Sequence, residues 1–97
     1  MNTQYQSVKK IFQTEPYYLE CIRKTIAVFP PLNCPQEYKE AICGLSGGED
    51  LTDYINEPLE SLTGRTILQV LQARDYEAIE QYIFECVSLD IAGPGSY

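Results

Sequence analysis

The sequence predicts an all-α fold, arranged as a compact single domain of five or six short helices with an extended C-terminal tail. Apolar residues recur at intervals of three and four along almost the whole chain, which is the spacing of a helix with one buried face. No segment alternates apolar and polar residues over a useful length, so strands are not expected. The length of 97 residues suits one domain and not two.

The first half of the chain is expected to contain three helices. Apolar residues at helical spacing over residues 8–12 predict a short first helix. Thr14 is the predicted N-cap of a second helix, which has an acid and a proline in its first turn and ends at the Pro30-Pro31 pair. A third helix is expected over residues 35–43, with Gly44 as its C-terminal cap.

The second half is expected to contain three more helices. Glu49 and Asp50 begin a fourth helix, which Pro58 ends. Thr66 begins a short fifth helix, because a glutamine follows three positions later at the spacing of a capping box. Asp75 caps the last helix, which carries an apolar face along most of its length.

A Ser-Gly-Gly run at residues 46–48 divides the chain into these halves. Residues 1–48 form an N-terminal helical segment whose role the sequence leaves open. Residues 49–97 form the second segment, and we expect both to pack as one compact unit. Residues 91–97 contain a Gly-Pro-Gly run that ends regular structure, which predicts the extended tail.

The net charge of −7 is unevenly distributed. The first half has five bases against four acids, a balance of +1, whereas the second half has ten acids against two arginines, a balance of −8. A surface this negative repels phosphate, so direct binding of nucleic acid is disfavoured and a basic protein partner is expected. The simpler interpretation is that the charge only keeps a small protein soluble.

Features typical of an enzyme are missing from the sequence. The chain has no histidine, which removes the commonest general base and any Ser–His or Cys–His arrangement. It also has no glycine-rich phosphate-binding loop. We therefore expect a protein that is not an enzyme and uses no cofactor.

The cysteines at positions 21, 34, 43 and 86 lack the spacing of a structural zinc site, so no metal is expected. We expect reduced thiols that are mostly buried. The N-terminus has no apolar leader, and no run reaches the roughly 18 apolar residues that a membrane span requires. These observations predict a cytoplasmic protein that does not associate with a membrane.

The second half carries a distinctive order of residues between Leu51 and Ile91. The features in order are Tyr54-Ile55, Pro58, Leu62, Gly64-Arg65-Thr66, Val70-Leu71, Asp75-Tyr76, Ile79 and Ile83. This order resembles the toxin-binding domain shared by the Xre, MbcA and ParS antitoxins. The sequence departs from that family at Tyr54, where tryptophan is usual, at Thr63, where glycine is usual, and at Ile67, where proline is usual.

The resemblance implies an antitoxin that occludes the active site of a RES-type, NAD-consuming toxin with its final helix and tail. It implies five partner-binding residues: Glu77, Glu80, Glu85, Asp90 and Tyr97. A structural corner would set the angle between two helices, and it comprises Tyr54, Pro58, Gly64, Arg65 and Thr66. The residues alone also allow Glu77 and Glu80 to be plain solvated acids on the outer face of a helix. The oligomeric state stays open between a monomer and a homo-oligomer.

A second hypothesis uses the acidity differently. In this hypothesis the protein is a small acidic inhibitor of the phage or immunity type, and it blocks a nuclease or an interference complex by nucleic-acid mimicry. The acids that would carry this role are Glu49, Asp50, Asp53, Glu57 and Glu60. A structural or adaptor domain with neither activity is the third interpretation.

Overall fold

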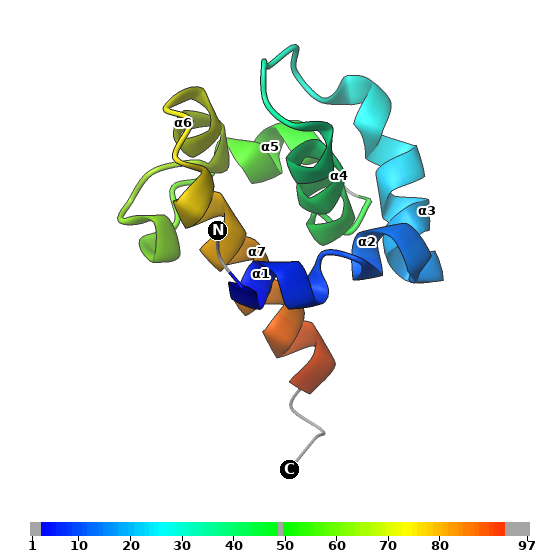
Figure 1. Ribbon diagram of the computed structural model, residues 1–97. Helices are drawn as coiled ribbons and strands as arrows, with labels where there is room; N and C mark the ends of the chain where they lie inside the picture. The colour runs from blue at the N-terminus through cyan, green and yellow to red at the C-terminus, as the bar shows by residue number, and fades with distance from the viewer. Residues whose placement is uncertain (1–2, 49, 93–97) are drawn as a thin grey trace.

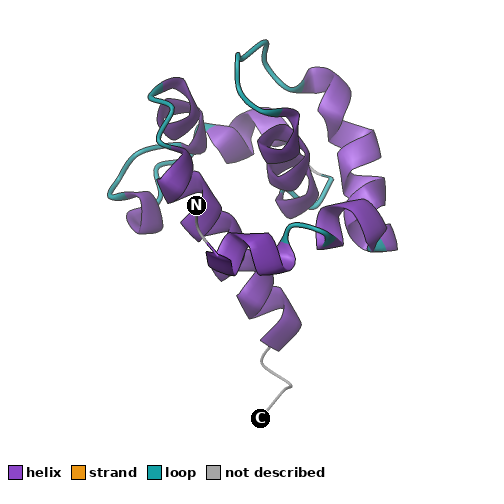
Figure 2. Ribbon diagram, in the orientation of Figure 1, coloured by secondary structure: helices purple, strands orange, loops and turns teal. Residues whose placement is uncertain are grey.

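The computed structural model describes the backbone of residues 3–48 and 50–92 and the side chains of these residues as far as Leu89. Within this described part the regular structure is entirely helical, which confirms the all-α prediction (Figures 1 and 2). The elements are α1 (Thr3–Val8), α2 (Ile11–Thr14), α3 (Pro16–Thr25), η1 (Ile26–Val28), α4 (Gln36–Leu45), α5 (Leu51–Ile55), η2 (Glu60–Leu62), α6 (Ile67–Gln72) and α7 (Tyr76–Ala92). The last five residues of the predicted tail lie outside the described residues.

Helix α7 is the element on which the two halves of the chain meet. It packs against α1 and α4 from the first half and against α6 and η2 from the second (Figure 1). A single core cluster contains Tyr5 and Ile42 from the first half together with Ile79, Ile83 and Val87 from α7. The Ser-Gly-Gly run therefore joins two parts of one hydrophobic core.

The start of the chain differs from its prediction. The single helix expected over residues 8–12 is interrupted between α1 and α2. The prediction that Thr14 caps the next helix is wrong, because Thr14 is the last residue of α2 and its hydroxyl donates to the carbonyl of Lys10 at 3.0 Å. Glu15 occupies the N-cap position of α3 instead, without a side-chain cap, and Pro16 begins the helix.

The helix starts of the second half agree with the sequence. The Asp50 carboxylate accepts hydrogen bonds from two backbone amides of α5. Thr66 and Gln69 form the predicted capping box, with reciprocal bonds of 3.0 and 2.9 Å. Asp75 accepts from the Ala78 amide at 3.3 Å in the first turn of α7. These local predictions are confirmed, since each depends only on residues two or three positions apart.

Gly44 has a different role from the predicted cap. Helix α4 continues through it to Leu45, and Ser46 takes the C-cap position. A Cβ atom at Gly44 would lie 2.9 Å from Cδ1 of Phe12 and 3.2 Å from Cδ1 of Tyr18. The missing side chain therefore lets α2 and α3 pack closely against α4.

We predict that Gly44→Ala destabilises the protein by about 1–3 kcal/mol because the new methyl group overpacks this contact. In an open position alanine would stabilise the helix by about 1 kcal/mol relative to glycine. The sign of the change in unfolding free energy therefore shows whether overpacking or helix propensity is the stronger effect. Urea unfolding followed by circular dichroism measures it. The cost should be smaller in a Phe12→Leu background, and a Gly44→Ala protein as stable as the original would contradict the close packing.

Candidate functional site

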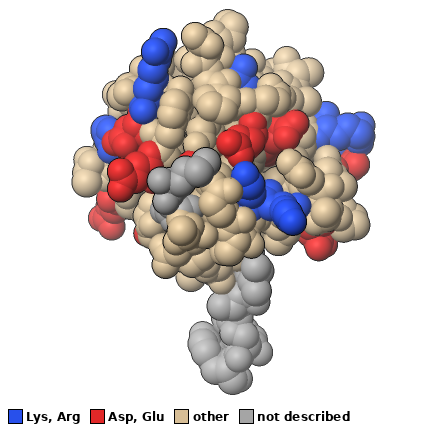
Figure 3. Space-filling model, in the orientation of Figure 1, with Lys and Arg blue, Asp and Glu red and all other residues tan. Residues whose placement is uncertain are grey.

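The acids of the second half separate into those that are paired or buried and those that are exposed without an ion pair. Asp75 forms an ion pair with Arg65 at 3.1 Å, and Glu80 is buried with 6% of its surface exposed. Six further acids are exposed and form no ion pair within the described residues: Asp50, Asp53, Glu57, Glu60, Glu77 and Glu85. Glu85 accepts a hydrogen bond from Gln81 at 3.0 Å. The negative excess of this half therefore lies at the surface. On the face of the whole molecule seen in Figure 3, acidic side chains form small groups with basic side chains beside them.

Three of these acids surround an open hollow of about 510 Å³. The acidic hollow is lined by Ser46, Asp50, Asp53, Tyr54 and Glu57. Asp50 caps α5, Asp53 lies in its first turn and Glu57 follows its C-terminal end, so the three recur at helical spacing. Three carboxylates around one concave surface attract cationic groups and repel phosphate.

Tyr54 connects the acidic hollow to the core. Its hydroxyl lies 2.5 Å from the hydroxyl of Tyr82 in α7, which ties α5 to the central helix. Burial, then the nearby Tyr54 hydroxyl, raise the pKa of Tyr82 well above its usual range. Pro58 is exposed and follows the end of α5 at Ile55.

The predicted corner is braced by Arg65. Its Nε donates to the Leu62 carbonyl at 3.2 Å, and its guanidinium also donates to Asp75 at 3.1 Å. Thr63 and Gly64 have φ angles of 57° and 83°, so the chain turns sharply before α6. Arg65 therefore links this turn to the start of α7.

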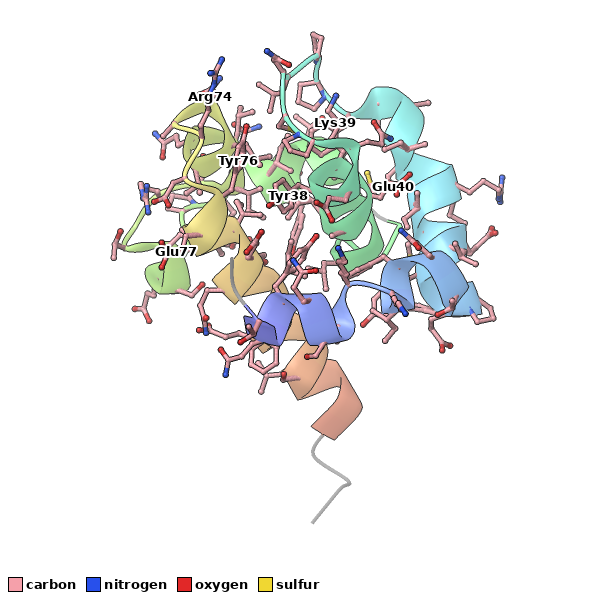
Figure 4. All side chains as sticks on the ribbon, viewed as in Figure 1. Tyr38, Lys39, Glu40, Arg74, Tyr76 and Glu77 are labelled. Carbon is pink, nitrogen blue, oxygen red and sulfur yellow. The ribbon has the colours of Figure 1, made fainter. Side chains whose placement is uncertain are left out.

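The prediction that Glu80 lies on the partner-facing surface of α7 is wrong. Its Oε2 accepts a hydrogen bond of 2.5 Å from the hydroxyl of Tyr38 in α4. The Tyr38 ring stacks on Tyr76 with centroids 5.1 Å apart, and Figure 4 shows the two rings between α4 and α7. Glu80 precedes Ile83 and Val87 by three and seven positions, which places it on the inward stripe of the helix. That spacing was the signal that could have identified it.

The other partner-binding residues divide between described and undescribed positions. Glu77 and Glu85 are exposed on α7, as expected for contact residues. The side chain of Asp90 and the whole of Tyr97 lie outside what the structure describes, as does Glu49. Leu89 is 71% exposed near the end of α7, and sequence reasoning did not identify it.

A second acid–tyrosine contact lies beside the first. The Tyr5 hydroxyl of α1 donates to Oε2 of Glu37 in α4 at 2.9 Å, and the rings of Tyr5 and Tyr38 are 5.8 Å apart. Burial, then the bonded carboxylates, raise the pKa values of both tyrosines well above their usual range. We call Tyr5, Glu37, Tyr38 and Glu80 the tyrosine–glutamate cluster.

The cysteines are free thiols, with Cys21 and Cys43 buried and Cys34 and Cys86 partly buried. Burial raises the pKa values of the Cys34 and Cys43 thiols, so both are weak nucleophiles at neutral pH. Among the described residues, no group of three or more histidine, cysteine or acidic side chains is arranged to hold a metal ion. No helix in this part of the chain is long and apolar enough to cross a membrane.

Comparisons with family models, characterised proteins and solved structures found no match to the chain. The resemblance to the antitoxin domain therefore stays a prediction from the residues of the second half.

We predict that Tyr38→Phe destabilises the protein by about 1.5–3 kcal/mol, because a buried carboxylate loses a hydrogen-bond donor. Tyr76→Phe is the matched control, since it retains the ring stacked on Tyr38 and should change the free energy of unfolding by less than about 0.5 kcal/mol. Chemical unfolding measures both variants. If Tyr38→Phe costs no more than Tyr76→Phe, the hydroxyl of Tyr38, and hence its bond to Glu80, does not stabilise the fold.

The raised tyrosine pKa values predict a loss of stability in alkali. The folded protein keeps Tyr5, Tyr38 and Tyr82 protonated above the unfolded pKa of about 10, whereas the unfolded chain releases those protons. Their contribution is therefore complete below about pH 10 and falls above it by roughly 1.4 kcal/mol per pH unit for each tyrosine. Urea unfolding at increasing pH should show this slope, and Tyr5→Phe should reduce it by one such increment. A slope unchanged by that variant would contradict the assignment.

Proposed function

We propose that the protein is an antitoxin-like inhibitor, and not an enzyme itself, that binds the basic active-site cleft of a RES-type, NAD-consuming toxin in the cytoplasm. The observation that carries this proposal is that Glu77 and Glu85, both exposed on α7, form no ion pair within the described residues. Such a surface is complementary to a cleft that binds the phosphates of a dinucleotide.

Exposed side chains along α7 support this mode of binding. Glu77 and Glu85 offer two exposed carboxylates on the helix, and Leu89 offers an exposed apolar side chain. Interfaces commonly combine apolar anchors with a polar rim, because the apolar contact supplies affinity and the charges supply orientation and association rate. Glu80 is not part of this surface while it is bonded to Tyr38.

The acidic hollow favours a second candidate function. Asp50, Asp53 and Glu57 gather on one concave surface, as expected if carboxylates imitate phosphates before a nuclease or interference complex. Tyr54 holds that surface on the core through Tyr82. The two candidates use different acids, so charge reversal separates them.

The test mixes the protein with a RES-domain toxin from the genome that encodes it and follows NAD consumption. We expect inhibition by the original protein and an inhibition constant at least about tenfold weaker for Glu77→Lys/Glu85→Lys, because two attractive charges become repulsive. Glu15→Lys/Glu40→Lys makes the same change of net charge in the first half and should retain inhibition.

Two outcomes would redirect the assignment. If the toxin consumes NAD at the same rate with and without the protein, the antitoxin proposal is wrong. If Asp50→Lys/Asp53→Lys/Glu57→Lys abolishes inhibition of a nuclease, with a strong dependence on salt, the acidic hollow is the binding site and mimicry is the function.

A further inference from the structure

We draw no further inference here: the strongest candidate, the exposed apolar surface that Leu19 of α3 and Val28 of η1 present, carries none because nothing in the structure shows what covers it.

Discussion

The hydrogen bond between Tyr38 and Glu80 constrains how the two halves of this protein meet. A carboxylate with only 6% of its surface exposed is costly to bury unless a donor satisfies it, and Tyr38 supplies that donor from α4. A shift of α7 by one residue would turn Glu80 by about 100° away from Tyr38 and leave the charge without this bond. Apolar contacts alone tolerate such shifts more easily, so the bond fixes the register of α7 on α4.

The same bond decides which acids remain available to a partner. The second half has a balance of −8, but Glu80 is directed into the core and Asp75 is paired with Arg65. The remaining described acids lie at the acidic hollow, on η2 and on the exposed part of α7. A count of acids along the sequence therefore suggests more exposed charge on α7 than the structure has. It also does not show that three acids gather around one hollow at α5.

Local features of the fold follow from the sequence, and its long-range contacts do not. Caps at Asp50, Thr66 and Asp75 involve residues a few positions apart, so residue type and spacing predict them. Gly44 was misinterpreted because its role depends on Phe12, which is distant in the chain. The inward direction of Glu80 follows from its spacing to Ile83 and Val87, but its partner Tyr38 lies 42 positions away, so the sequence does not identify the bond. The sequence groups the three acids Asp50, Asp53 and Glu57, but it does not predict that they line a concave surface.

Three buried or partly buried hydroxyl contacts connect helices that are distant in sequence. Tyr5 bonds α1 to α4, Tyr38 bonds α4 to α7, and Tyr54 with Tyr82 bonds α5 to α7. Phenylalanine would fill similar volumes, but it would leave Glu80 without its donor and α5 without a directional link to α7. These contacts form a continuous series from α1 to the acidic hollow, with α7 in the middle. The series places α1 and the acidic hollow at opposite ends of one chain of bonded helices that passes through α4 and α7.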